Sequence, residues 1–323
     1  MPVLGYSHIQ LEWQLPEWRN WYERLAEKRK VIRYDGRGGG LSDRNVIDFS
    51  LDSHVRDLEA VVDRLGLERF VLFGILHSGP AAIAYAADHP KRVSHLILWC
   101  TYARASDYYE APEIPGMLAL VDKDWRLFTE MVANMVLGWS AGEETRQFAD
   151  YMRETITPEV MRHAWSAIFD YDVATMLEDV QSPTLVLHRR GIRWLTADMA
   201  KGLASRIPRA SLNLMEGASS LPFEEDVLTA IRDFLGEGEE TAAAPGLTAD
   251  DIRTILFTDV EGSTALTQRL GDAKAREVLR EHERIVREAL RAHGGSEVKT
   301  MGDGFMASFP SATRALECAI AMQ

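Results

Sequence analysis

Short apolar runs alternate with amphipathic stretches over the first 235 residues of the chain. The runs are rich in Val, Ile, Leu and Phe and carry few polar positions, which is typical of parallel strands covered by helices on both faces. The predicted strands are 31–34, 70–73, 96–99, 184–187 and 212–215. The pattern therefore predicts an α/β fold built on a mainly parallel sheet.

A helical stretch rich in Met and Trp, residues 104–178, interrupts this alternation. It holds six of the chain's twelve methionines. The residues concerned are Met117, Met131, Met135, Met152, Met161, Met176, Trp125, Trp139 and Trp165. Because Met adapts to irregular apolar surfaces, the stretch is either a lid over a pocket for a small apolar ligand or an insertion that fills its own core. The residue types leave both interpretations open.

The pattern changes after residue 235. Residues 236–247 are small and acidic and lack an apolar stripe, so we expect a linker. A short apolar strand then precedes a long amphipathic helix at about 265–293, which Gly294-Gly295 ends. Two apolar strands joined by Gly-Asp-Gly follow within 296–309. The predicted domains are therefore 1–235 and 248–323.

Composition and charge narrow the class of protein. Apolar residues make up 46% and charged residues 26%, as in ordinary globular proteins. The 36 basic and 49 acidic residues give a net charge of −13, which argues against nucleic-acid or anionic-membrane partners. No apolar run approaches the ~18–20 residues of a membrane span, and the N-terminus lacks a signal pattern. With only Cys100 and Cys318, both expected to be reduced, we expect a cytoplasmic protein.

Several segments of the first part resemble α/β hydrolases. Residues 34–43 are similar to the loop after the fourth strand of that fold, and 73–79 to its nucleophile elbow, a strained strand-to-helix turn. Residues 188–193 and 217–223 resemble the loops that carry the catalytic acid and histidine. Residues 3–13 resemble the end of the third strand and the oxyanion-hole loop, so the first two strands are expected to be missing. The resemblance implies an α/β-hydrolase-like sheet with a helical lid at about 104–178.

The catalytic triad of that family is not present at the matching positions. The elbow register places Leu76 where the nucleophile belongs, while Ile192 stands in place of the acid and Ser220 in place of the histidine. Serine attack needs a base and a group that orients it, and these side chains supply neither. Ser78 with the adjacent His77 is a poor substitute, because neighbouring residues on a turn into a helix do not face each other. The triad is therefore degenerate.

Candidate chemistry in the second part begins where its first apolar strand ends. Asp259 follows the strand, and Gly262, Ser263 and Thr264 stand in the first turn of the next helix. A strand-end carboxylate beside free helix N–H groups suits a divalent cation and a triphosphate together. An ordinary helix cap is the commoner explanation of such an Asp. Asp303, in an Asp-Gly hairpin turn, has an equally ordinary structural explanation when taken alone.

The combination of Phe-Thr-Asp-x-x-Gly-Ser-Thr with Lys-Thr-x-Gly-Asp-Gly-Phe is far more specific, and it resembles bacterial class III adenylate/guanylate cyclases. The resemblance implies the first half of a ferredoxin-like α+β cyclase domain. It implies that Asp259 and Asp303 hold two Mg²⁺ or Mn²⁺ ions and that Lys299 reads adenine, which favours ATP. A solvated strand lysine is the other interpretation of Lys299. A second cyclase domain, as in a homodimer, is expected to complete the site, and further catalytic groups are expected beyond Gln323.

Three functional hypotheses follow. The chain is the N-terminal part of a nucleotide cyclase with a hydrolase-like sensor domain, an active esterase or lipase with a cyclase segment, or a ligand-binding pseudo-enzyme. The degenerate triad argues against the second hypothesis. The pair of aspartates favours the first for the parent protein.

Overall fold

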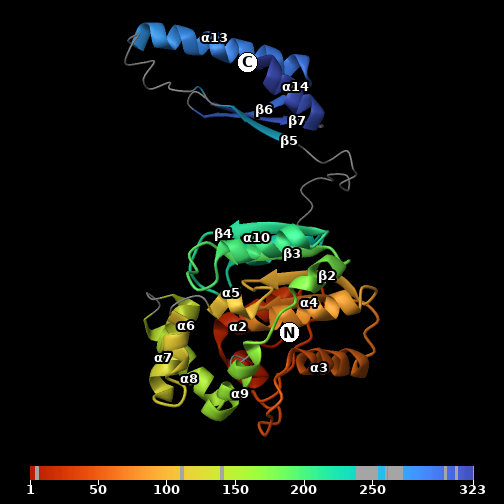
Figure 1. The fold of residues 1–323 in the computed structure, drawn as a ribbon, viewed down its shortest axis with the longest axis vertical. Coiled ribbons are helices and arrows are strands. Elements are labelled where there is room, and N and C mark those ends of the chain that lie inside the picture. Colours follow the sequence, from red (N-terminus) through yellow and green to blue (C-terminus); the bar gives the residue numbers. More distant parts are fainter. Residues whose placement is uncertain are drawn as a thin grey trace. The chain divides into compact units, whose positions relative to one another are not determined.

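The computed structural model describes residues 1–3, 7–109, 113–138, 142–237, 254–258, 260, 272–301, 304–309 and 312–322. The chain divides into two compact units, Met1–Glu239 and Glu240–Gln323, which are described separately (Figure 1). Among the described residues, no helix is long and apolar enough to cross a membrane.

Unit 1, Met1–Glu239, is built on a four-stranded parallel sheet in the order β1-β2-β3-β4. The strands are β1 (Phe70–Ile75), β2 (Val93–Trp99), β3 (Thr184–Arg189) and β4 (Ala210–Met215). The four predicted runs from residue 70 onward are therefore confirmed, as is the mainly parallel α/β sheet.

The predicted strand at 31–34 is wrong. These residues are described but belong to no strand. An apolar, β-branched run shows only that the side chains of a segment suit a buried strand. To form a strand, the segment also needs a neighbouring strand whose backbone N–H and C=O groups are free and aligned with its own. Beside β1 the Met1 amino group donates to the Phe73 carbonyl at 2.7 Å. The run instead contributes side chains: Arg33 pairs with Glu12 at 2.6 Å and Tyr34 packs against the core.

Helices cover both faces of the sheet because alternate strand residues point in opposite directions. In β2, Leu96 and Leu98 belong to one apolar cluster, whereas Ile97 and Trp99 belong to another. The first cluster is shared with α3 (Leu51–Arg64), α4 (Gly79–Asp88) and α10 (Ala197–Arg206). The second is shared with α2 (Pro16–Ala26) and α11 (Glu225–Phe234). A short helix, α1 (Ile9–Gln14), precedes α2.

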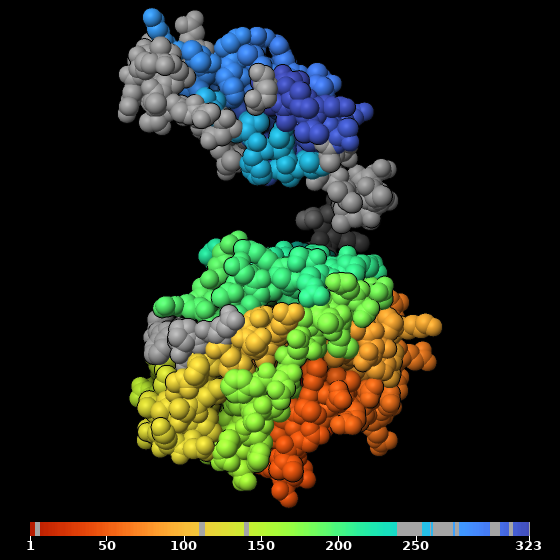
Figure 2. Space-filling model, in the orientation of Figure 1, coloured from red at the N-terminus to blue at the C-terminus, as the bar shows by residue number. Residues whose placement is uncertain are grey.

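The stretch between β2 and β3 forms a helical insertion on the sheet, and its segments adjoin one another on the surface of unit 1 (Figure 2). It comprises α5 (Ala105–Tyr109), α6 (Glu113–Leu118), α7 (Trp125–Leu137), α8 (Glu143–Thr155), α9 (Pro158–Ile168) and the 3₁₀ helix η2 (Ala174–Asp179). Its buried Met117, Met152 and Trp165 share one apolar cluster with Leu76 and Trp99. The insertion therefore packs directly onto the sheet and does not form a separate core.

Unit 2, Glu240–Gln323, contains an antiparallel sheet in the order β5-β7-β6. The elements are β5 (Thr254–Thr258), α13 (Asp272–Ala292), β6 (Ser296–Met301), β7 (Gly304–Phe309) and α14 (Ala312–Met322). The predicted strands are confirmed, and the part of the predicted helix before residue 272 lies outside the described residues. Gly294, at φ 70°, follows α13, and the Gly295 N–H closes the helix end on the Leu290 carbonyl. Cys100 and Cys318 are both free and buried, as expected.

Candidate functional site

The turn from β1 into α4 has the geometry of a nucleophile elbow, with leucine at its apex. Leu76 has φ 49°, a left-handed conformation that is strained for a residue with a branched side chain. A Cβ at Gly74 would lie 2.7 Å from the Ala82 Cβ, so glycine is needed for the strand to approach the helix. The backbone of the elbow is therefore present, and the residue at its apex is a leucine.

Two hydroxyl groups hold this turn. Ser78 Oγ accepts from the Ile75 N–H at 3.1 Å and donates to the Ile75 carbonyl at 2.9 Å. Thr101 Oγ1 donates to the Leu76 carbonyl at 2.6 Å. The Ser78 hydroxyl thus stabilises the strained turn and is already engaged on both its donor and acceptor sides. Ser78 stands two residues after Leu76, where the elbow motif has its second glycine. This serine was the signal in the sequence, but its role in holding the turn was not predicted from it.

His77 lies in an aromatic environment, where it contacts three aromatic side chains. Its Nδ1 is 2.7 Å from the Tyr102 hydroxyl, and its ring makes edge contacts with Tyr108 and Trp165. Burial lowers the pKa of His77 to about 3. A histidine with so low a pKa stays neutral near pH 7 and is a weak general base. The contact with Tyr102 engages one ring nitrogen of His77, and the expectation that His77 and Ser78 form no dyad stays a prediction.

The stability of unit 1 is expected to fall as the pH decreases from 6.5. Burial lowers the pKa of His77 to about 3 and that of His54 to about 4, whereas both are near 6.5 in the unfolded chain. Between these values the unfolded state binds more protons, so the stabilisation present above pH 6.5 is lost as the pH falls through that window. Each histidine contributes a slope of up to about 1.4 kcal/mol per pH unit.

Urea unfolding at pH values from 7 to 5, followed by signals that arise from unit 1, measures this effect. The free energy of unfolding is compared between the native chain and His77→Gln. The variant is expected to show a shallower slope. An equal slope in both proteins would contradict the neutral, buried state of His77.

The other two triad positions are also built into the core. Ile192 belongs to the same apolar cluster as Leu76. Ser220 is fully buried, and its N–H and hydroxyl both donate to the Val136 carbonyl of α7, at 2.7 and 3.2 Å. The Ser220 carbonyl accepts from Trp99 Nε1 at 2.7 Å. Leucine and isoleucine carry no ionisable group, and Ser220 instead ties the helical insertion to the sheet.

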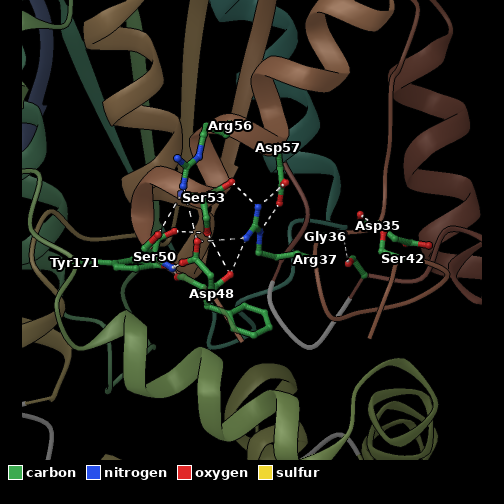
Figure 3. A network of polar contacts seen from close by, with 12 residues as sticks. Asp35, Gly36, Arg37, Ser42, Asp48, Ser50, Ser53, Arg56, Asp57 and Tyr171 are labelled. Carbon is green, nitrogen blue, oxygen red and sulfur yellow. Dashed lines mark hydrogen bonds and ion pairs between the residues drawn. The ribbon is translucent and has the colours of Figure 1, made fainter. Parts of the chain in front are cut away.

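A polar network fixes the loop between residues 34 and 51 (Figure 3). Arg37 donates to both carboxylate oxygens of Asp57 at 2.7 and 2.8 Å, and to the carbonyls of Asp48 and Ser53 at 2.7 and 3.0 Å. The Tyr171 hydroxyl donates to the Phe49 carbonyl at 2.5 Å. Bidentate arginine pairs with carboxylate are strong and directional. The network therefore anchors this loop to α3 and to the end of the helical insertion.

In unit 2, the described strands flank the predicted metal-binding residues. Thr258, the last residue of β5, pairs with Phe305 of β7, whose N–H donates to Thr258 Oγ1 at 3.3 Å. Asp259 follows Thr258 in the chain, and Asp303 precedes β7 by one residue. The two aspartates are therefore covalently attached to neighbouring ends of one strand pair.

The predicted site residues of unit 2 are only partly within the described structure. Asp259, Gly262, Ser263, Thr264 and Asp303 lie outside the described residues. Lys299 is in β6 and pairs with Met306 of β7, but its side chain is outside the described set. The described part of the chain contains no group of three His, Cys, Asp or Glu residues that could hold a metal ion. Convergence of the two carboxylates stays a prediction.

Comparison with protein families identifies both parts of the chain. The α/β hydrolase fold matches residues 5–226, so the chain belongs to that family. The adenylate and guanylate cyclase catalytic domain matches residues 248–323. The chain thus joins an α/β hydrolase domain to a cyclase-domain segment.

Individual relatives fall into the same two groups. A pimeloyl-[acyl-carrier protein] methyl ester esterase of Nitrosomonas europaea is 25% identical over 216 residues, 64% of this chain and 84% of that protein. An adenylate cyclase of Podospora anserina is 44% identical over 84 residues, 26% of this chain but only 4% of that protein. The structure of a hydrolase from Oleispira antarctica aligns with a TM-score of 0.61 and 21% identity, covering 69% of this chain and 86% of the other. That structural likeness concerns the fold alone.

Proposed function

We propose that the protein carrying this chain converts ATP to cyclic AMP and pyrophosphate, and that its α/β-hydrolase-like domain is a non-hydrolytic sensor. The proposed domains are 1–235, a linker at 236–247, and the first half of a cyclase domain at 248–323. The observation that carries the cyclase assignment is the pairing of Thr258 with Phe305, which brings the chain segments next to Asp259 and Asp303 together.

The residues of the cyclase segment fit the proposed chemistry. Carboxylate oxygens are the preferred ligands of Mg²⁺ and Mn²⁺, so Asp259 and Asp303 would hold the two ions. When bound, such a pair supplies activation of the attacking hydroxyl and neutralises charge on the phosphates. Gly262, Ser263 and Thr264 would bind phosphate oxygens through backbone N–H groups. Lys299 would contact the adenine.

A second cyclase domain, in a homodimer, is proposed to complete this site. The family resemblance is the basis of that proposal.

The sensor role of unit 1 rests on the three degenerate triad positions. Leu76 and Ile192 share the apolar cluster beneath the helical insertion, and the Ser220 hydroxyl is bonded to the Val136 carbonyl. A fold that keeps its elbow and lid elements but lacks a nucleophile, acid and base is suited to bind a ligand without cleaving it.

Substitution of Lys299 tests the choice of nucleotide. In the full-length protein with Mn²⁺, Lys299→Glu is expected to lower the preference for ATP over GTP by about 10- to 100-fold, because a charged hydrogen bond contributes about 1.5–3 kcal/mol. Parallel assays of cyclic AMP and cyclic GMP, with kcat/KM for each nucleotide, measure this ratio. Lys274→Glu, at an exposed lysine of α13, is the matched control. An unchanged ratio would mean that Lys299 is a solvated strand residue.

A further inference from the structure

Unit 1 contains a cleft that is separate from the elbow. It has a volume of about 670 Å³ and lies between η2, α10 and the loop that joins β3 to α10. Leu177, Trp194 and Leu203 form apolar parts of its wall, and each is at most 8% exposed. Pockets of 300–1,000 Å³ with apolar walls are typical of small-molecule sites. The cleft is therefore large enough and apolar enough to hold a small organic ligand.

The polar residues of the cleft carry more positive than negative charge. Arg104, Arg193 and Arg206 line it together with Asp107 and Asp198. This local excess of arginine is notable in a chain with a net charge of −13. An arginine without an acidic partner attracts an anionic ligand, so the pairing of these three arginines decides whether the cleft can hold one.

One of these arginines is available for a ligand. Two of the three arginines already form ion pairs: Arg104 Nε lies 3.4 Å from Asp172 Oδ2, and Arg206 Nη2 lies 3.5 Å from Glu178 Oε1. Arg193 is exposed and makes no ion pair with any residue in the described part of the chain. The fork of an arginine side chain matches a carboxylate in geometry and charge. Arg193 is thus the group that would pair with the anion.

The two acidic residues limit the charge of that anion. Asp107 and Asp198 line the same cleft, and Asp198 is paired with Lys201 of its own helix at 2.7 Å. Like charges at close range repel, so a polyanion such as a triphosphate would meet two carboxylates as well as the arginines. A ligand with a single negative charge and an apolar body fits better.

We propose that this cleft binds a small amphipathic carboxylate, with its apolar body on Leu177, Trp194 and Leu203 and its carboxylate on Arg193. The proposal gives a ligand class to the sensor role but concerns binding alone, so it does not depend on cyclase activity. Trp194 also connects the cleft to the helical insertion. Its Nε1 donates to the Met135 carbonyl at 3.2 Å and its ring makes an edge contact with Tyr108.

Calorimetric titration of the 323-residue chain with octanoate tests the proposal. Binding is expected, and Arg193→Gln should weaken it about tenfold or more, as the loss of a charge-assisted hydrogen bond implies. Arg190→Gln is the matched control, because Arg190 is on the same loop, does not line the cleft and pairs with Glu216. Octanol, which has the same chain without the charge, should bind at least about tenfold more weakly.

A second variant separates the cleft from other surfaces. Gly202 lines the cleft within α10, and a Cβ there would meet nothing within 4 Å. Gly202→Leu should therefore fold, since it also raises helix propensity, while its side chain blocks the cleft. Gly202→Ala, which adds a single methyl group, is the control. Loss of octanoate binding in the leucine variant alone supports the proposal.

Four results would overturn it. They are no binding of octanoate, equal binding of octanol, unchanged octanoate binding in Arg193→Gln, and octanoate binding that survives Gly202→Leu. Because each is read from binding, none of them bears on whether the full-length protein makes cyclic AMP.

Discussion

Alanine at Asp259 or at Asp303 is expected to lower cyclic AMP formation by the full-length protein by at least about 10²–10³-fold, the usual loss when one group that stabilises transition-state charge is removed. The two aspartates together would hold the two ions, so neither variant should retain an intact pair. The strand register supports this expectation, because Thr258 directly precedes Asp259, Phe305 lies two residues after Asp303, and these two strand residues are paired. Mn²⁺-dependent turnover of ATP is the measurement.

A surface carboxylate provides the control for these two variants. Glu281 of α13 is paired with Arg284 on the same helix, and exposed pairs of this kind contribute little to stability. Glu281→Ala should therefore leave cyclic AMP formation within about twofold of the native rate. Full activity in both aspartate variants would remove the metal-site interpretation, whereas no activity in the native full-length protein would favour the pseudo-enzyme.

The native chain is expected to show no saturable hydrolysis of short-chain nitrophenyl esters. Loss of a triad typically costs about 10⁴–10⁶-fold in turnover, and here all three positions are occupied by residues that cannot perform their roles. Restoring the nucleophile alone, in Leu76→Ser, should not restore activity. Ile192 and Ser220 would still supply neither an acid nor a base, so the serine proton would have no acceptor.

Hydrolysis that saturates with ester concentration and disappears in Ser78→Ala would contradict this expectation and favour the esterase hypothesis. Because the Ser78 hydroxyl also holds the elbow through Ile75, the thermal stability of the variant must be measured beside its activity. Loss of activity at unchanged stability would identify Ser78 as a nucleophile. A rate indistinguishable from buffer in the native chain would support a binding role for unit 1.

Much of the local structure follows from the sequence because short-range physics determines it. The four apolar runs after residue 70 became β1 to β4, since each had a neighbour to pair with. The Gly294-Gly295 pair ended α13 because a glycine readily takes the left-handed conformation that closes a helix. Leu76, in the segment that resembles the elbow motif, has a left-handed backbone conformation with φ 49°.

Other features depended on contacts between distant segments. The run at 31–34 has the composition of a strand, yet within the described residues it pairs with no strand, and its side chains serve packing and the Glu12 ion pair. The helical insertion could have formed its own core, but its apolar faces meet the sheet around Trp99. The low pKa of His77 arises from burial against residues far along the chain, such as Trp165.

The cleft in unit 1 shows most clearly the difference between what the sequence determines and what the tertiary structure decides. Leu177, Arg193 and Leu203 belong to η2, a loop and α10, and no motif connects them in the sequence. The sequence by itself determined the two families, the four strands of unit 1 and which residues stand at the three expected triad positions, because these depend on residue identity and local spacing. Only the tertiary structure decided which side chains share a cavity and which of the cleft's arginines has no ion pair within the described residues, because both depend on how helices from separate parts of the chain pack on one sheet.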